Sequence, residues 1–276
     1  MRTYPFQQII ALLCVLLFPL SACKKELAPF SSENGFTPIE DSVATEQEII
    51  PDVWDLSDTD VSEIDPSRNL IAFTFDDAPS SELENILAVF AEFNENNPDC
   101  KAFASVFCNG YLCDESSLVT LHAAYALGFE MGNHTYSHFD LTSLNESKLK
   151  MEIDETDKLL QRIDGKKRHL LRAPFGKIND FVKQTAYTPL IDWTIDTLDW
   201  TGKSEKEIFD EVFNHKKDGH IVLMHDTKGH TTSALKSLLP ALKEANDQVV
   251  SVSQLAKAHG CVLKRGNVYI RARKQF

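Results

Sequence analysis

The feature that most constrains the fold is a regular alternation, from Asn69 onward, of short apolar runs with longer segments of helical apolar spacing. Short buried strands that alternate with helices are typical of parallel sheets, so the sequence predicts an α/β fold. Strands are expected over 70–75, 102–107, 129–133, 169–172, 190–194, 220–224 and 249–252. Helices are expected over 81–94, 118–127, 146–163, 204–215 and 232–245.

Charged or histidine-containing groups follow the ends of five of these expected strands. They are Asp76 and Asp77, His134, Arg172, Asp196 and Asp199, and His225 and Asp226. The carboxyl ends of parallel strands meet at one face of an α/β barrel, and active sites are built there. The pattern therefore predicts one site at this face.

Two of these groups have the chemistry of metal ligands. The adjacent carboxylates of Asp76 and Asp77 would repel each other unless a metal ion or an arginine compensated their charge. His134 and His138 are four residues apart and can reach one ion if the segment is helical or tightly turned. Two imidazoles and one carboxylate leave coordination positions open for water and substrate, which a hydrolytic metal site needs.

Each motif has an ordinary structural interpretation when it is taken alone. An Asp-Asp pair before Ala-Pro is commonly a turn or a helix cap. Five motifs in order are more specific: TFDD (74–77), HTYSH (134–138), RAPFG (172–176), DTLDW (196–200) and IVLMHD (221–226). Together they resemble the motifs of the polysaccharide deacetylases with a NodB homology domain, carbohydrate esterase family 4. The resemblance implies a distorted, partly open (β/α) barrel of about seven parallel strands over residues 67–276.

The resemblance also implies a role for each matching residue. Asp77, His134 and His138 would hold one divalent metal, usually zinc, with cobalt or another divalent metal as alternatives. Asp76 would be the general base and His225 the general acid. Arg172 would orient Asp76, and Asp199 would keep His225 protonated.

Three further residues would surround the substrate. The backbone N–H of Phe175 would stabilise the oxyanion, and Trp200 and Leu223 would form walls of the acetyl pocket, although both also suit a plain core. Two positions depart from the family pattern: Ala78 replaces a common Gly, and Phe139 replaces a common Pro. If the backbone at Ala78 needed a positive φ, its methyl group would shift the Asp76-Asp77 loop.

The first 22 residues have the layout of a bacterial signal peptide, with an apolar run over 9–20. Twelve residues make about 18 Å of helix, which is too short to span a bilayer. The segment Leu20-Ser21-Ala22-Cys23 resembles a lipobox, so Cys23 is the expected lipid anchor on the membrane of the cell envelope. Ordinary secretion without lipid is the alternative.

Residues 23–66 are expected to form an acidic tether. Residues 31–66 contain 11 acids and no Lys or Arg, whereas residues 67–276 contain 29 acids and 25 bases. Neither region has a concentrated basic stripe, which argues against nucleic acid as a partner. Outside the cytoplasm, Cys100, Cys108, Cys113 and Cys261 suggest disulfides. Three pairings are possible and the sequence does not select among them, although the short Cys108 to Cys113 loop is an easy closure.

The sequence therefore predicts an exported hydrolase that removes N-acetyl groups from a GlcNAc-containing polysaccharide, with peptidoglycan ahead of chitin-like or biofilm polymers. One alternative is an O-acetyl esterase of the xylan type, because the same site would cleave an ester. Another is a glycan-binding lipoprotein whose site has decayed. The sequence leaves protein partners unknown.

Overall fold

The structure, a computed structural model, describes residues 50–273 of the chain. The expected signal peptide, Cys23 and the first part of the tether lie outside the described residues. Within residues 50–273 no helix is both long enough and apolar enough to cross a membrane.

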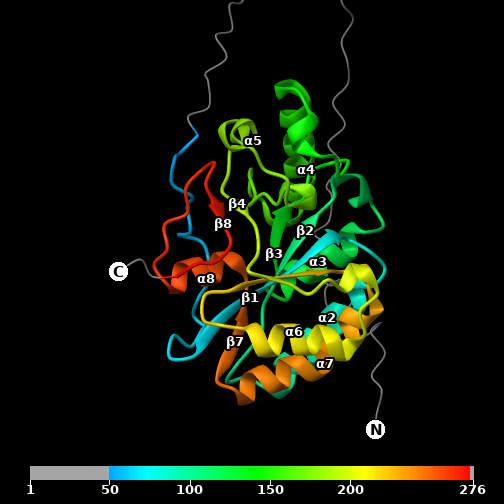
Figure 1. Ribbon diagram of the computed structural model, residues 1–276, viewed down its shortest axis with the longest axis vertical. Helices are drawn as coiled ribbons and strands as arrows, with labels where there is room; N and C mark the ends of the chain where they lie inside the picture. The colour runs from blue at the N-terminus through cyan, green and yellow to red at the C-terminus, as the bar shows by residue number, and fades with distance from the viewer. Residues whose placement is uncertain (1–49, 274–276) are drawn as a thin grey trace, which may run out of the picture. The chain divides into compact units, whose positions relative to one another are not determined.

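Parallel strands form the centre of the described domain (Figure 1). They are β1 (Asn69–Ala78), β2 (Ser105–Cys108), β3 (Glu130–Asn133), β4 (Leu190–Ile191), β5 (Ile195–Asp196), β6 (Ile221–His225), β7 (Asp247–Val250) and β8 (Val268–Tyr269). The main sheet has the order β3-β2-β1-β6-β5, and β7 also pairs with β1. Strands β4 and β8 form a separate parallel pair.

The expected strand over 169–172 is reduced to bridges at one residue. Leu171 forms isolated parallel bridges to Asn133, at the end of β3, and to Leu190 in β4. Of the expected strand over 190–194, only Leu190–Ile191 forms a strand, β4, and β5 begins at Ile195. The buried Arg172 side chain donates hydrogen bonds to the carbonyl oxygens of Ile191 and Asp192, which lie at the end of β4 and directly after it. The strands thus curve into a distorted barrel that is incompletely closed, which confirms the predicted fold.

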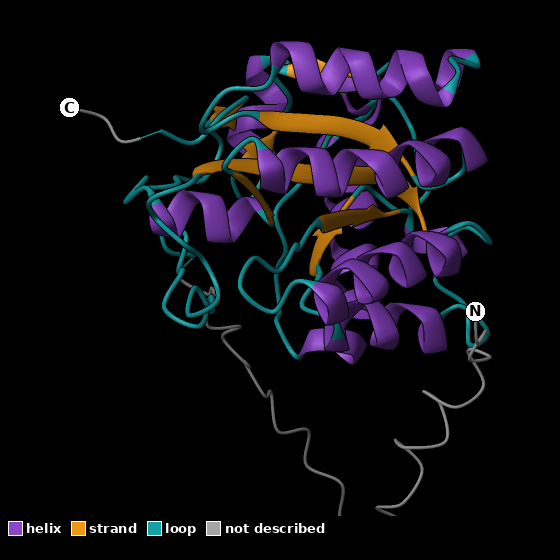
Figure 2. Cartoon of the chain, turned by 90° about the horizontal axis from the view of Figure 1, so that it is seen from below, coloured by secondary structure: helices purple, strands orange, loops and turns teal. Residues whose placement is uncertain are grey.

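Helices surround these strands (Figure 2). Five were expected: α2 (Leu83–Asn96), α3 (Leu118–Ala126), α4 (Glu146–Asp164), α6 (Glu205–His215) and α7 (Gly229–Glu244). Two were not: α5 (Asp180–Thr185) and α8 (Val252–Ala258). The Ser204 side chain caps α6 in the predicted capping box with Glu207. A second box, of Ser251 and Gln254, starts α8, so the expected strand over 249–252 ends at Val250.

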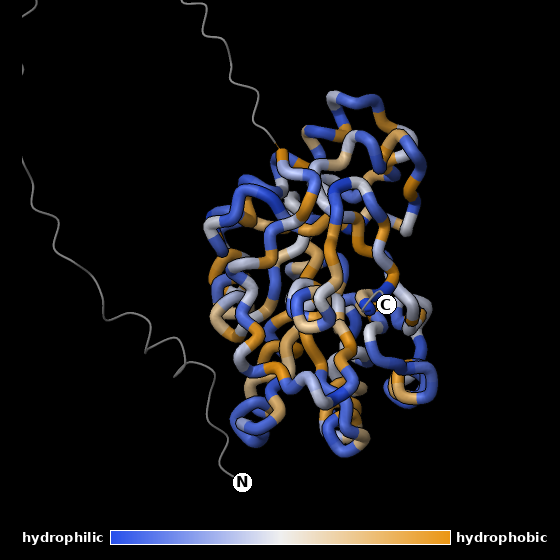
Figure 3. Tube along the Cα trace, turned by 90° about the vertical axis from the view of Figure 1, so that its left-hand side faces the viewer, coloured by the Kyte–Doolittle hydropathy of each residue, from blue (hydrophilic) through white to orange (hydrophobic). Residues whose placement is uncertain are grey.

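The alternation of side chains along β1 divides the core. Ile71, Phe73 and Phe75 pack into the cluster that includes α2 and α7, and the apolar stretches of the chain run through the interior (Figure 3). The intervening positions face the opposite side of the strand. Thr74 and Asp76 occupy two of these positions, where both are buried. The strand thus carries polar groups into the barrel interior.

The folded domain begins before residue 67, where the tether was expected to end. A second cluster of buried apolar residues includes Ile64 together with Leu255 and Leu263. The side chains of Trp54, Leu56 and Val61 pack against this cluster. The acidic side chains between them do not oppose this packing, because they are exposed and accept hydrogen bonds within local turns, as Asp55 does from the Ser57 N–H at 2.8 Å. The acidic composition alone therefore placed the boundary too late.

The expected disulfides are not present among the described residues, where all four cysteines are free. Cys108 and Cys113 are both buried in the main core cluster, and Cys100 is also buried. Buried thiols act here as small apolar groups, a common use of cysteine that sequence cannot distinguish from pairing.

Candidate active site

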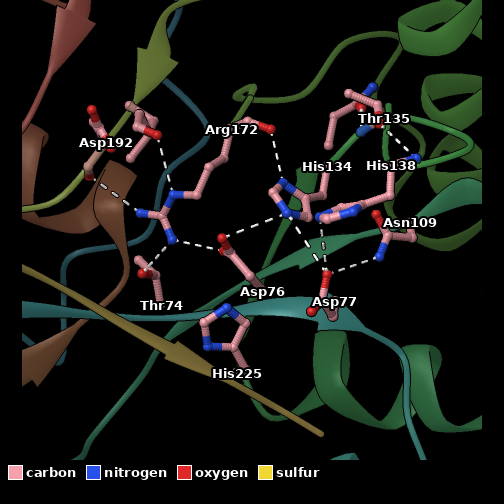
Figure 4. Close-up of polar contacts among 12 residues, drawn as sticks. Thr74, Asp76, Asp77, Asn109, His134, Thr135, His138, Arg172, Asp192 and His225 are labelled. Atoms are coloured by element: carbon pink, nitrogen blue, oxygen red, sulfur yellow. Dashed lines mark hydrogen bonds and ion pairs between the residues drawn. The ribbon is translucent and has the colours of Figure 1, made fainter. Parts of the chain in front are cut away.

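The residues predicted to form the site converge where the main strands end (Figure 4). Asp76 and Asp77 lie in the last part of β1, and His225 ends β6 in direct register with Asp76. His134 follows β3 immediately, and Asp199 begins a 3₁₀ turn, η4 (Asp199–Thr201), after β5. Parallel pairing therefore brings together groups that are far apart in the sequence.

Asp77, His134 and His138 form a compact cluster of donor atoms, all within 4.8 Å of one another. Asp77 Oδ1 lies 3.4 Å from His138 Nε2 and 3.8 Å from His134 Nε2. Asp77 has a left-handed backbone, with φ of 65°, and its Oδ1 also accepts a hydrogen bond from Asn109 Nδ2 at 3.1 Å. Asn109 was not predicted, because nothing in its local sequence marks it.

The tautomer of His134 follows from its partner. Its Nδ1 lies 2.8 Å from the carbonyl oxygen of Arg172, and a carbonyl can only accept. Nδ1 must therefore carry the hydrogen, which leaves the lone pair of a neutral ring on Nε2, facing Asp77. A backbone carbonyl that orients a ligand histidine in this way is common at metal sites.

The segment between the two histidines is tightly turned rather than helical. Thr135 and His138 have φ angles of 69° and 57°. Asn133 Oδ1 accepts a hydrogen bond from the Thr135 N–H at 2.8 Å, and Thr135 Oγ1 accepts one from the His138 N–H at 3.1 Å. These bonds compensate a backbone conformation that β-branched residues such as threonine rarely adopt.

Helix α4 supports this turn through buried acidic side chains. Glu152 Oε2 accepts a hydrogen bond from the Ser137 N–H at 2.6 Å, and Asp157 Oδ1 accepts one from Asn133 Nδ2 at 2.8 Å. Sequence reasoning missed both acids. Their signal was present, because they share the spacing of the buried apolar residues of α4 and so lie on its buried face.

Asp157 also belongs to a buried charged group with His169 and Asp164. His169 Nδ1 lies 2.9 Å from Asp157 Oδ1, and Nε2 lies 3.2 Å from Asp164 Oδ1. Burial lowers the pKa of His169, but the hydrogen bonds and charges of the two carboxylates outweigh it and raise the pKa to about 9. The ring is therefore a cation at neutral pH.

We expect this group to make stability depend on pH. The pKa of His169 is raised from 6.5 to about 9 by folding, so its contribution is complete below about pH 6.5 and is lost as the pH rises through 9. The loss is on the order of a few kcal/mol. Urea unfolding from pH 6 to pH 10 should show the free energy of unfolding falling over this window, and His169→Gln should flatten the fall. An equal slope in both proteins would contradict the assignment.

Arg172 is fully buried and holds Asp76 by a short ion pair. Its Nη1 donates to Asp76 Oδ1 at 2.8 Å and to Thr74 Oγ1 at 2.7 Å. Its Nε and Nη2 donate to the carbonyl oxygens of Ile191 and Asp192. The other Asp76 oxygen, Oδ2, lies 3.6 Å from His134 Nε2 and therefore faces the ligand cluster.

His225 and Asp199 form a second charged pair beside the pair of Asp76 and Arg172. Its Nδ1 lies 2.7 Å from Asp199 Oδ1, while its backbone N–H and the Thr231 hydroxyl donate to Asp199 Oδ2. Burial lowers the pKa of His225, but the hydrogen bond and charge of Asp199 raise it above its ordinary value. Burial opposes ionisation of Asp199, yet its bond to His225 keeps its own pKa low. The pair therefore favours a protonated histidine beside a carboxylate.

The three predicted substrate contacts differ in exposure. Phe175 is 62% exposed, and its ring centroid lies 4.7 Å from that of His138. Trp200 is also exposed, at 57%. Leu223, by contrast, is buried in β6.

The expected shift of the Asp76-Asp77 loop depended on a positive φ at Ala78, and Ala78 has none. The residue with positive φ is Asp77, whereas Ala78 is buried in the main core cluster. Phe139, at the other departure, is partly exposed, with Lys148 Nζ 4.9 Å from its ring centroid. Neither position displaces a predicted ligand.

Asp226 forms hydrogen bonds with Ser80 that were not predicted. Its Oδ2 accepts from the Ser80 N–H at 2.7 Å, and its backbone carbonyl accepts from the Ser80 hydroxyl at 2.8 Å. Burial raises the pKa of Asp226 to about 7. These bonds fasten the loop after β6, beside His225, to the loop after β1, beside Asp77.

The cluster fits a divalent metal. Two donors that each lie about 2.1 Å from a tetrahedral ion are roughly 3.4 Å apart, close to the separations of Asp77 from the two histidines. Burial, together with the neighbouring His134, also lowers the pKa of His138 and favours the neutral ring that a metal ligand requires.

Comparison with known proteins identifies the family. The polysaccharide deacetylase family profile matches residues 63–188. The chain is 30% identical over 204 residues to a peptidoglycan-N-acetylglucosamine deacetylase of Bacillus cereus, covering 71% of this chain and 92% of that protein. The chain belongs to the polysaccharide deacetylase family. The family profile begins within the segment expected to be tether, in agreement with the packing of that segment.

Two further comparisons place this deacetylase domain among its relatives. It is 31% identical over 192 residues to the peptidoglycan-N-acetylmuramic acid deacetylase PdaC of Bacillus subtilis, covering 70% of this chain and 40% of PdaC. The solved structure of PdaC from Bacillus subtilis superposes with a TM-score of 0.65 at 30% identity, covering 71% of this chain and 93% of that structure. The chain thus spans less than half the length of full PdaC.

Proposed function

We propose that this deacetylase domain is a metal-dependent hydrolase that removes N-acetyl groups from an extracellular GlcNAc-containing polysaccharide, peptidoglycan first. The observation that carries the proposal is that one face holds three potential ligands, a buried Asp76–Arg172 pair and the Asp199–His225 pair. The Bacillus cereus relative is named for the same reaction. PdaC is named for N-acetylmuramic acid, so the sugar itself needs a direct test.

Asp77, His134 and His138 would hold the metal, with zinc ahead of cobalt or another divalent ion. When bound, it would supply Lewis acidity that makes water more acidic and polarises the acetamide carbonyl. Asn109 and the carbonyl oxygen of Arg172 would orient the ligands.

Asp76 would act as the general base. Arg172 engages its Oδ1 and so fixes the carboxylate, while Oδ2 faces the ligand cluster and is placed to accept a proton from the attacking water. The Phe175 backbone N–H would stabilise the oxyanion, and the ring of Phe175 beside His138 supports that placement. Trp200 and Leu223 would bound the acetyl group.

His225 would act as the general acid. An amine leaves an amide only when its nitrogen is protonated, so the acid must be charged before the carbon–nitrogen bond breaks. Asp199 occupies Nδ1 and raises the pKa of His225, which leaves Nε2 as the nitrogen available to the leaving amine. Thr231 and the His225 N–H fix the carboxylate in turn.

An acetate-release assay on defined glycans tests this proposal, with metal content measured on the same sample. We expect acetate from N-acetylated peptidoglycan fragments, loss of release after chelation and recovery with added zinc. Release from acetylated xylan alone would favour the esterase, and release that ignores chelation would contradict the metal site. Binding to glycans without release by the metal-loaded protein would favour a decayed site.

We further propose that the protein is exported and held on the cell envelope by a lipid on Cys23. The signal peptide layout and the lipobox support this, and the peptidoglycan named for the relatives lies outside the cytoplasm. Replacing Cys23 by alanine should move the protein from the membrane fraction to the soluble exported fraction. Unchanged membrane association would contradict the lipid anchor.

A further inference from the structure

A basic groove runs along the surface beside β8, with a volume of about 1170 Å³. Its wall is formed mainly by residues 260–273, the red segment in Figure 1. The residues that line it include four basic side chains and no Asp or Glu: Lys183, Lys264, Arg271 and Arg273. In a chain with a net charge of −13, this groove is a local reversal of charge.

Three of these cations form no direct ion pair within the described residues. Lys183 pairs with Asp180 at 3.0 Å, but no ion pair joins Lys264, Arg271 or Arg273 to a carboxylate in residues 50–273. Arg273 Nε donates to the backbone carbonyl of Asp218, which fixes its position without cancelling its charge. The groove is therefore a positively charged surface.

The charges of these basic side chains also affect a neighbouring histidine, His220. His220 pairs with Arg271 in an antiparallel bridge. Burial lowers the pKa of His220, and the charges of Arg273, Lys217 and Arg271 lower it further. His220 therefore lies within reach of the charges of Arg271 and Arg273.

Exposed aliphatic side chains lie among these cations. Val262 and Ile270 line the groove and are 57% and 42% exposed. Val53, 50% exposed, lies opposite Lys264 in an antiparallel bridge, which places the two side chains on the same face. Single exposed aliphatic residues are ordinary. Beside unpaired cations they supply the combination of apolar surface and positive charge that favours binding to anionic membranes.

The preceding chain joins the domain beside this groove. The Arg265 N–H donates to the carbonyl of Asp52, and the Trp54 N–H donates to the carbonyl of Leu263. Ile50, the first described residue, is three residues from Val53, at most about 11 Å along the chain.

We propose that this face docks on the surface of an anionic phospholipid bilayer. Lys264, Arg271 and Arg273 would lie over the lipid phosphates, and Val53, Val262 and Ile270 would enter the interface. A bilayer suits this face better than a soluble acidic partner does, because it satisfies the aliphatic side chains as well as the charge. The proposal stands apart from the catalytic one and does not require the lipid on Cys23.

Vesicle co-sedimentation tests the proposal with the unacylated chain that begins at Lys24, which keeps the compact unit Glu48–Phe276. We expect binding to phosphatidylcholine vesicles that contain phosphatidylglycerol, weakened by salt, and little binding to phosphatidylcholine alone. Each basic side chain near an anionic surface strengthens binding about fivefold. Replacing Lys264, Arg271 and Arg273 by glutamine should therefore weaken binding by up to roughly a hundredfold, with the thermal transition retained.

The matched control replaces three exposed lysines of other faces by glutamine: Lys158, Lys206 and Lys236. This control should bind like the parent chain, and hydrogen exchange should slow over residues 260–273 when anionic vesicles are added. Equal loss in both triple variants would mean that net charge alone governs binding. That result would overturn the proposal, as would equal binding to both vesicle types, or capture by soluble polyanions without binding to vesicles.

Discussion

Replacing Asp76 by asparagine lowers kcat by about 10²- to 10⁴-fold while the protein keeps its metal, if the roles proposed for the two adjacent carboxylates are correct. In the parent protein Arg172 Nη1 lies 2.8 Å from Asp76 Oδ1. Asparagine keeps the shape of the side chain and an oxygen that Arg172 can still reach, but it cannot accept the proton. Steady-state acetate release and metal analysis on the same preparation measure both effects.

Asp77→Asn is the matched control, because it makes the same chemical change one residue later. Asp77 belongs to the ligand cluster, whereas Asp76 is held by Arg172. We therefore expect Asp77→Asn to weaken metal binding, which zinc titration measures. Its main effect should be on metal affinity rather than on the kcat of the metal-loaded protein. Loss of metal from Asp76→Asn, or normal turnover by it, would show that the two roles are wrongly assigned.

Replacing Arg172 by methionine should destabilise the domain by about 3 to 5 kcal/mol, because it leaves the buried Asp76 without its charge partner. Arg172 is fully buried and donates hydrogen bonds to two side chains and two carbonyl groups. For a domain of this size the loss corresponds to a fall in Tm on the order of 10 °C. Calorimetry and urea unfolding measure it.

Arg162→Met provides the comparison, because Arg162 forms a solvent-exposed ion pair with Glu115. Exposed pairs contribute about 0 to 1 kcal/mol, so this variant should unfold nearly like the parent. The double variant Arg172→Met with Asp76→Asn should recover part of the stability lost by Arg172→Met alone, because the unpaired buried carboxylate is gone. Equal costs at Arg162 and Arg172, or no recovery in the double variant, would argue against a buried ion pair.

Long elements with strong periodicity were predictable. The helical spacing over 146–163 and the capping box at Ser204 gave α4 and α6 nearly to the residue. Short elements were not predictable: α5 has six residues and β8 two, too few for a periodic pattern. The strand expected over 169–172 is reduced to one bridging residue, Leu171.

The candidate site was predicted through its motifs, and its supporting residues were not. Glu152, Asp157 and Asn109 hold the ligand loops. The spacing of Glu152 and Asp157 marks them as buried residues of α4, but nothing in the sequence around Asn109 marks it. The four described cysteines are a case in which the sequence suggested bonds that the fold does not form. Four thiols in a chain expected to be exported suggest pairing, yet whether two of them are joined depends on their separation in the fold.

The sequence by itself determined the alternation of strands and helices and the residue types at the strand ends, including Asp77, His134 and His138. Both follow from local rules, since hydrophobic period and ligand chemistry are properties of short segments. Only the tertiary structure decided that Asp77 rather than Ala78 takes the positive φ, that Arg172 is buried against Asp76, and that residues 50–66 pack on the domain. These outcomes depend on contacts between residues distant in sequence, whose energies no local pattern records.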